Sequence, residues 1–449
     1  MRIKLGYKMT LSEISSVLNS ACPCEKNIGY ITTDSREVKS GDLFVALRGE
    51  NYNGEDYVEE AIAKGAIALC TRKKKSAIVV HNTTDALLDL AAYYKKGLKR
   101  LKYSVAITGS VGKTTTKEFL KQISSVKYKT HATIGNMNNQ IGMPLSVLSA
   151  PMDSEVIILE MGMNNSGEIS KMSGCIKPDI AVITNIGTSH IGNLGSRKNI
   201  AKAKLEITEG QTDGSLIVPY GEDLLKGANA KRFSTSDISA DYYLQSKEKD
   251  NISLYENGRC AFTSNFCFTD QHLLTCLAAA IAAAREMRLT DVETVNGISL
   301  ISNDNIRQKI IRANNIYFLE DCYNSSLESV KADIDVMNSL VGYSAKSLLL
   351  GDILELGEHS EKIHKEIGRM ISPSDFKNLY LFGNHARYIM SGAVDAGFPE
   401  SRIFGNFSDD ISISARQLID NTSENEIILL KASRKIRLER IIEIVKATD

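Results

Sequence analysis

Short runs of consecutive apolar residues recur along the chain, separated by stretches in which apolar residues return at helical spacing. The runs at 103–107, 156–159 and 180–184 predict buried strands, because apolar residues there do not alternate with polar ones. After the first run, Phe119, Leu120 and Ile123 follow a helical period. Alternation of strand and helix predicts an α/β fold whose functional groups lie at the C-terminal ends of the strands.

The same pattern predicts three domains, at residues 1–98, 99–303 and 304–449. The first is a small N-terminal α/β domain with an expected strand at 43–47, and the stretch 95–102, rich in lysine, is expected to be a linker. The second is a central domain with a parallel sheet of the P-loop ATPase kind. The third is Rossmann-like, because apolar strands at 347–350, 379–382 and 427–430 each end in small or polar residues, but it lacks the dinucleotide fingerprint.

Composition narrows the class of protein. The 449 residues carry 54 Lys and Arg against 54 Asp and Glu, so no overall charge favours nucleic acid or a membrane surface as a partner. The N-terminus lacks the apolar run of a signal peptide, and the apolar helix at 273–284 is too short to span a bilayer. The eight cysteines are scattered and are expected to be reduced thiols. We therefore expect a cytoplasmic monomer without membrane insertion.

The most informative stretch is 107–116, Ile-Thr-Gly-Ser-Val-Gly-Lys-Thr-Thr-Thr. Glycines let backbone N–H groups approach an anion, and the helix that follows directs the positive end of its dipole at it. Lys113 adds a mobile positive charge and Thr114 a hydroxyl for Mg²⁺. Only two residues separate Gly109 from Gly112, fewer than in the common P-loop. The stretch predicts a phosphate-binding loop; the structural alternative is a plain glycine turn.

Further polar residues follow the predicted strands. Glu160 ends the strand at 156–159, His190 lies one loop after the strand at 180–184, and Lys204 lies on a predicted helix. Oxygen and imidazole groups that converge on a phosphate loop suit Mg²⁺ with ATP. Taken singly, these residues are equally well explained as a paired surface carboxylate, a loop histidine and a solvated lysine.

Two other stretches combine polar groups with turns. Asn136, Asn138 and Asn139 lie among glycines, either as a turn cluster or as amide groups near the phosphate loop. Arg36, next to Ser35, can hold a phosphate through its planar guanidinium, although composition alone favours an exposed turn with an ion pair.

The short loop followed by Lys-Thr-Thr resembles the ATP-binding loop of the Mur ligases, which build the peptide of bacterial cell-wall precursors. Other stretches are similar to this family in the right order along all three domains. Asp34-Ser35-Arg36 with 41–47 resembles its UDP-binding domain. The stretches 135–145, 321–329, 351–358 and 431–434 resemble the branch that adds D-alanyl-D-alanine.

The resemblance assigns roles to particular residues. ATP is expected to bind Gly109, Ser110, Val111, Gly112, Lys113, Thr114, Thr115, Arg307, Asp321 and Asn324. Substrate is expected to bind Ser35, Arg36, Asn136, Asn138 and Asn139. Mg²⁺ is expected to be held by Thr114, Glu160, His190 and Lys204, the last as a carbamate formed with CO₂. Lys113, Glu160, His190 and Lys204 are the expected catalytic residues.

The implied reaction uses ATP and Mg²⁺ to phosphorylate the terminal carboxylate of UDP-N-acetylmuramoyl-tripeptide. The amine of D-alanyl-D-alanine then attacks the acyl phosphate, leaving ADP and phosphate as the other products. Lys113, Arg307 and Mg²⁺ are expected to stabilise the transferring phosphoryl group.

The chain also departs from the family pattern. Leu273 and Cys276 replace two asparagines expected near adenine, and Ser326 replaces another asparagine. Three alternatives follow: the ligase that adds the third residue, folate polyglutamate ligase, and a non-catalytic relative that binds nucleotide sugars. The missing Asp-Asn-Pro-Arg motif argues against the third-residue ligase, and the presence of Asp34-Ser35-Arg36 argues against folate polyglutamate ligase. The complete set of expected metal ligands argues against a non-catalytic relative. The sequence leaves open whether the third residue of the tripeptide is lysine or diaminopimelate.

Overall fold

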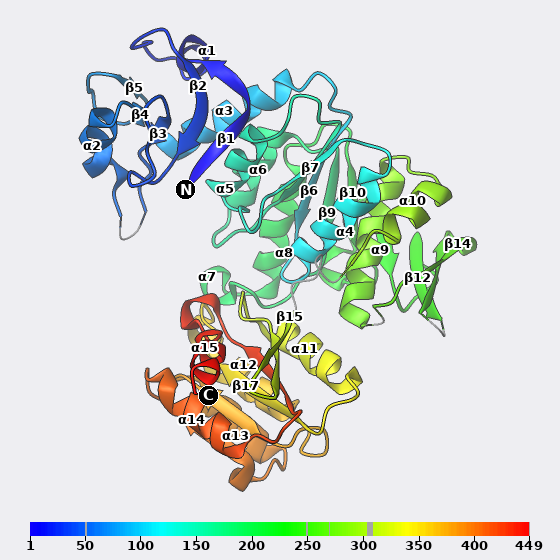
Figure 1. Cartoon of the computed structure of the whole chain (residues 1–449). Coiled ribbons are helices and arrows are strands. Elements are labelled where there is room, and N and C mark those ends of the chain that lie inside the picture. The colour runs from blue at the N-terminus through cyan, green and yellow to red at the C-terminus, as the bar shows by residue number, and fades with distance from the viewer. Residues whose placement is uncertain (50–51, 248–249, 269, 303–308, 449) are drawn as a thin grey trace.

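The computed structural model describes residues 1–49, 52–247, 250–268, 270–302 and 309–448 and contains three sheets (Figure 1). The N-terminal sheet has the order β1-β2-β3-β4-β5, antiparallel between β1 and β2 and parallel elsewhere. Its strands are β1 (Arg2–Thr10), β2 (Asn27–Thr32), β3 (Leu43–Val45), β4 (Ile67–Cys70) and β5 (Ala77–Val79). The accompanying helices are α1 (Leu11–Val17), α2 (Val58–Ala63) and α3 (Thr83–Gly97).

The central sheet has nine strands in the order β14-β13-β12-β11-β10-β9-β6-β8-β7. The strands from β7 to β12 are parallel, as predicted, but β13 and β14 extend the edge as an antiparallel pair that the sequence pattern did not indicate. The strands are β6 (Tyr103–Thr108), β7 (Thr130–Ala132), β8 (Val156–Glu160), β9 (Ile180–Ile183), β10 (Ser215–Pro219), β11 (Lys231–Ser234), β12 (Tyr242–Lys247), β13 (Asn251–Glu256) and β14 (Arg259–Asn265). The helices are α4 (Lys113–Ser125), α5 (Gly142–Leu148), α6 (Glu168–Ile176), α7 (Ile191–Leu194), α8 (Arg197–Leu205), α9 (Gln271–Glu286) and α10 (Asp291–Ile298).

The C-terminal sheet has six strands in the order β15-β16-β20-β17-β18-β19, parallel except for the β15–β16 pair. They are β15 (Lys309–Ala313), β16 (Ile316–Glu320), β17 (Lys346–Gly351), β18 (Leu379–Phe382), β19 (Ile403–Asn406) and β20 (Ile427–Lys431). The helices are α11 (Leu327–Ser339), α12 (Ser360–Arg369), α13 (Ala386–Asp395), α14 (Ile411–Asn421) and α15 (Arg440–Lys446). Three mixed sheets with helices between the strands confirm the predicted α/β fold.

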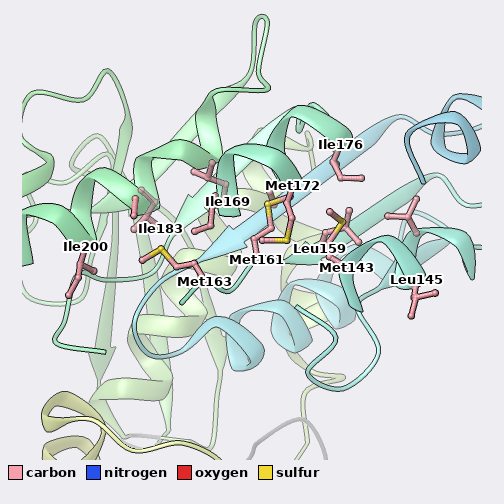
Figure 2. Packing of buried hydrophobic residues seen from close by; sticks show 14 of the residues in the cluster. Met143, Leu145, Leu159, Met161, Met163, Ile169, Met172, Ile176, Ile183 and Ile200 are labelled. Carbon is pink, nitrogen blue, oxygen red and sulfur yellow. The ribbon is translucent and has the colours of Figure 1, made fainter. Parts of the chain in front are cut away.

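The core explains why the central strands read as continuous apolar runs. Every residue of β8 is buried, because helices cover both faces of the sheet. On one face, Met143 of α5 and Ile169 and Met172 of α6 pack near Leu159 of β8 (Figure 2). The other face belongs to the cluster that contains α9, whose residues from Ala278 to Ala284 are all fully buried. A helix that is apolar all round is thus a core helix.

The prediction of a linker at 95–102 was wrong in its first part. Helix α3 continues to Gly97, and the Lys95 ammonium donates to the carbonyl of Ile176 at 2.5 Å and to Ser104 Oγ at 3.0 Å. Ile176 is the last residue of α6, and carbonyls at a helix C-terminus attract a cation. The lysines of this stretch led to the prediction of a solvated linker. The aliphatic part of a lysine can nevertheless pack against the protein while its ammonium reaches such carbonyls.

Among the described residues, we find no helix both long enough and apolar enough to cross a membrane.

Candidate active site

A cavity of about 440 Å³ is lined by residues from both the central and the C-terminal parts of the chain. In Figure 1 the C-terminal unit, yellow to red, lies on a different side of the central unit from the blue N-terminal unit. The central part contributes residues 110–115, Asn138, Asn139, Glu160, Ser189, His190, His272 and Leu273; the C-terminal part contributes Asp321, 323–326, Leu354, Glu355, Lys431 and 433–435. Most sequence-predicted site residues of these two parts therefore meet at one place.

The phosphate loop (residues 109–115) connects the end of β6 to the start of α4. Gly112 has a φ of +83°, which suits glycine, and a Cβ on Gly109 would lie 1.8 Å from Thr184 Oγ1. The N–H groups of Ser110 and Val111 each donate to Asn185 Oδ1 at 2.9 Å, so Asn185 fixes the shape of the loop from the end of β9. Helix α4 then presents the positive end of its dipole to the cavity.

An oxygen-rich cluster lies beside the phosphate loop. The Thr114 hydroxyl donates to Glu160 Oε2 at 2.7 Å, and the Asn138 amide donates to Oε1 of the same carboxylate at 2.7 Å. Glu160 is only 1% exposed, at the end of β8. Among the described residues no group of three or more His, Cys, Asp and Glu could hold a metal by itself. The cluster nevertheless fits Mg²⁺, which usually binds one or two protein oxygens together with substrate phosphates.

Lys204 is buried and is not among the residues that line the cavity. This residue of α8 is 2% exposed, and its pKa is held well below the ordinary value by burial and, secondarily, by the charge of Lys113. Lys113 itself donates to the carbonyl of Gly109 at 2.7 Å. A buried amine next to another cation favours its neutral form, which is the nucleophilic form of an amine.

His190 lies on the cavity wall just before α7, and its partner comes from the C-terminal part. Its Nδ1 donates to Glu355 Oε2 at 2.7 Å. This contact keeps the pKa of Glu355 below its usual value, because it outweighs partial burial, which would raise the pKa. The sequence indicated the motif that contains Glu355. It did not predict the contact with His190, because 165 positions separate the two residues.

The C-terminal wall contains a buried cation between two carboxylates. Lys431, at the end of β20, contacts Asp321 and lies 2.9 Å from Asp333 Oδ2. Burial alone would lower the pKa of Lys431, but the two carboxylates outweigh it and raise the pKa. Asn324 also lines the cavity, and its side-chain oxygen accepts from the N–H of Ser325 at 2.9 Å.

Leu273 and Cys276 of α9, which replace the two family asparagines, have different surroundings. Leu273 lines the cavity together with His272. Cys276 is 3% exposed and lies behind the phosphate loop, where its thiol is 3.7 Å from the carbonyl of Gly112.

Two groups of predicted site residues, Ser35 with Arg36 and Asn136, lie elsewhere. Ser35 and Arg36 belong to the N-terminal unit, and Arg36 pairs with Asp34 through two hydrogen bonds of 2.6 and 2.8 Å. Asn136 is exposed and is not among the residues that line the cavity. Arg307 lies outside the described residues.

A pair of aromatic rings near Arg36 was not anticipated. Tyr52 and Tyr57 stack with ring centroids 5.4 Å apart and are 41% and 39% exposed. The pKa of Tyr52 is raised by burial and also by Tyr57 and Asp34, so the rings lie within electrostatic reach of the Asp34–Arg36 pair. Exposed stacked rings next to a cation are typical of a ligand-binding surface, and the spacing of the residues in the sequence does not reveal the stacking.

Comparison with known proteins agrees with this geometry. Residues 107–284 match the model described as "Mur ligase middle domain", and 27–106 match "Mur ligase family, catalytic domain". The chain is 35% identical to UDP-N-acetylmuramoyl-tripeptide–D-alanyl-D-alanine ligase of Bacillus subtilis over 92% of both chains. It superposes on MurF from Acinetobacter baumannii with a TM-score of 0.87 and 26% identity, covering 99% of this chain and 100% of that one. It is also similar to MurF ligase from Thermotoga maritima in complex with ADP, with a TM-score of 0.79 and 26% identity over 93% and 97%.

Proposed function

Because this chain belongs to the Mur ligase family, we propose that it uses ATP to join D-alanyl-D-alanine to UDP-N-acetylmuramoyl-tripeptide in the synthesis of peptidoglycan precursors. The observation that carries this proposal is the shared cavity. The phosphate loop and Glu160 of the central part open into the same space as Asp321 and Lys431 of the C-terminal part. A ligase of this kind must hold a nucleotide and two further substrates against one another.

The chemistry requires activation of a carboxylate, which is a poor electrophile. Transfer of the γ-phosphoryl group of ATP to the tripeptide carboxylate gives an acyl phosphate and ADP. The amine of D-alanyl-D-alanine attacks the acyl carbon, the amide bond forms, and phosphate leaves with loss of a proton from nitrogen. Lys113 and the N-terminus of α4 stabilise negative charge on the transferring group, and the family resemblance assigns the same role to Arg307.

Thr114, Glu160 and His190 would hold Mg²⁺, which would supply charge neutralisation on the phosphates. Lys204 would carry a carbamate, because a neutral buried amine can form an N–C bond with CO₂ and lose a proton, and the resulting anion suits a site that holds cations. Asn138 holds Glu160 in place.

The UDP end of the precursor would bind the N-terminal unit at Ser35 and Arg36. There the guanidinium can pair with a diphosphate. The exposed Tyr52–Tyr57 pair offers a flat surface for a base nearby. The asparagines 136, 138 and 139 would contact the peptide part between the two regions.

We further propose that the chain acts as a monomer of three domains, 1–98, 99–303 and 304–449. Support comes from the sheets, because the pairing of strands in each lies within 2–79, 103–265 and 309–431 respectively.

The direct experiment measures ATP-dependent phosphate release by the purified protein. We expect turnover with UDP-N-acetylmuramoyl-tripeptide plus D-alanyl-D-alanine. A matched mixture contains UDP-N-acetylmuramoyl-dipeptide plus lysine or diaminopimelate. Turnover in the second mixture alone would assign the chain to the third-residue ligases, and turnover in neither would reject the proposed function.

A further inference from the structure

The segment 186–192, here named the histidine loop, is held by two carboxylates of the C-terminal part. The hydroxyl of Thr188 donates to Glu328 Oε2 at 3.0 Å. Two positions on, His190 Nδ1 donates to Glu355 Oε2 at 2.7 Å. A third hydrogen bond joins the two backbones, from the N–H of Gly192 to the carbonyl of Glu355 at 3.0 Å. Three hydrogen bonds thus cross between the two parts of the molecule at one loop.

The histidine loop also contacts the phosphate loop. The N–H of Gly187 donates to Ser110 Oγ at 2.9 Å, and the hydroxyl of Ser189 lies 3.4 Å from the carbonyl of Ser110. The histidine loop is therefore bound on one side to the nucleotide-binding machinery and on the other to the C-terminal part.

Local backbone geometry shows that the contact is closely fitted. His190 and Glu355 both have left-handed φ values, +63° and +64°, which side-chain-bearing residues rarely adopt. A Cβ on Gly192 would lie 2.6 Å from the carbonyl oxygen of Glu355, so only glycine permits this approach. Backbone outliers that face one another across a cavity wall are typical of functional sites.

The segment that carries Glu355 is itself fixed. The N–H of Leu354 donates to Ser433 Oγ at 2.9 Å, and the N–H of Ile353 donates to His364 Nε2 at 3.1 Å. His364 is fully buried. Glu355 therefore presents its carboxylate from a rigid support rather than from a free loop.

This geometry determines the state of the imidazole. An ionised carboxylate only accepts hydrogen bonds, so the proton of neutral His190 lies on Nδ1 and the lone pair lies on Nε2. A carboxylate or carbonyl on the second nitrogen is the usual means by which proteins orient a histidine that binds a cation.

We propose that Glu355 is a positioning residue that fixes the tautomer and orientation of His190 for a divalent cation in the cavity. The cation-binding face is then complete only when the C-terminal part is docked on the histidine loop. This inference rests on the proposed function, since it concerns the metal of that same site.

The test measures Mn²⁺ binding, by the decrease in the spectroscopic signal of free Mn²⁺, to full-length protein saturated with ADP. Glu355→Ala is expected to weaken Mn²⁺ affinity about 10-fold, the lower range for loss of a group that orients a ligand. Glu358→Ala is the matched control, because Glu358 is three residues away and its side chain is 89% exposed. Affinity for ADP without metal should be unchanged in both variants.

A double variant distinguishes loss of the orientation of His190 from a general loss of structure. In a His190→Ala protein, adding Glu355→Ala should weaken Mn²⁺ binding no further. Nitrogen NMR of the His190 imidazole should report a proton on Nδ1 in the wild type and a tautomer mixture in Glu355→Ala. Glu355→Gln, whose amide oxygen can still accept, should retain part of the affinity.

Wild-type affinity in Glu355→Ala, or an equal loss in the His190→Ala background, would overturn the inference. Because this assay needs ADP and Mn²⁺ but no ligase substrate, its result is separate from the turnover assay. A wild-type protein that ligates normally while Glu355→Ala binds Mn²⁺ normally would leave the proposed function standing and remove only the role of Glu355.

Discussion

Two buried lysines show how neighbours decide what a side chain can do. Lys431 lies between Asp321 and Asp333, and its pKa is raised above the ordinary value despite burial. Lys204 is equally buried, but its charged neighbour is Lys113, and its pKa is lowered. Lys431 is therefore a fixed cation that neutralises part of the cavity wall, whereas Lys204 favours the neutral amine that can react with CO₂.

Lys113→Ala is expected to lower kcat at least ~10²-fold, as loss of one preorganised charge-stabilising group does. The fold should persist, because Lys113 lines the cavity at the start of α4 and its ammonium donates to carbonyls of its own loop. Turnover and circular dichroism of the purified variant are the measurements. Lys121→Ala, on the same helix α4, is the control, and near-normal turnover in Lys113→Ala would refute the role.

Lys204→Ala should be almost inactive, and a small carboxylate at high concentration should restore part of the activity by refilling an anionic position. Lys202→Ala, exposed on the same helix α8, should leave turnover unchanged. Full wild-type activity in CO₂-free buffer, with a mass spectrum that shows only an unmodified lysine, would contradict the carbamate.

At the scale of elements, α9 serves two purposes at once. Its middle is fully buried against the central sheet, and its first turn reaches the nucleotide region. Positions 273 and 276 lie on the same side of the helix but nearly one turn apart along its axis, so they can meet different neighbours. Leu273 lines the cavity, whereas Cys276 packs under Gly112.

Leu273→Asn should therefore change nucleotide selectivity, because an amide in the cavity wall can pair with a base edge and leucine cannot. Cys276→Asn should instead weaken binding of ATP and GTP alike, since a Cβ on Gly112 would already lie 2.9 Å from the Cys276 sulfur and a larger group disturbs the loop. The measurement is the KM for ATP and for GTP. Equal behaviour of the two variants would show that Leu273 and Cys276 do not have separate roles.

At the scale of the whole molecule, a tyrosine joins the N-terminal and central units. The buried hydroxyl of Tyr94 on α3 accepts from the N–H of Tyr7 in β1 at 2.8 Å and donates to the carbonyl of Ala150 after α5 at 2.9 Å. A Cβ on Gly6 would lie 1.9 Å from the same carbonyl oxygen, so the two units are in close backbone contact. One hydroxyl satisfies polar groups on both sides of their junction.

Tyr94→Phe is expected to destabilise this junction by about 1–3 kcal/mol, because it leaves the N–H of Tyr7 and the buried carbonyl of Ala150 without that partner. Urea unfolding should show the loss, and limited proteolysis between the two units should become faster. Tyr93→Phe, at a 38% exposed neighbour, should change neither. Wild-type stability of Tyr94→Phe would mean that the packing, not the hydroxyl, holds the units together.

Much of the molecule was predictable because its signals are local. The strands at β6, β8 and β9 are continuous apolar runs, and the turn before Lys113 has its glycine where φ is positive. The family and the α/β fold followed from such stretches and are confirmed. The antiparallel pair β13–β14 was missed because short alternating segments at a sheet edge give a weak pattern.

The sequence by itself determined the alternation of strands and helices, the phosphate loop and the kinds of residue at the strand ends, because each depends on residues close together in the chain. Only the tertiary structure decided which distant groups meet. Asn185 shapes the phosphate loop, Lys95 donates to the C-terminal carbonyl of α6, and Glu355 contacts His190 across 165 positions. Such pairs depend on how sheets dock, and docking is set by the fit of whole surfaces, which no local pattern of residues encodes.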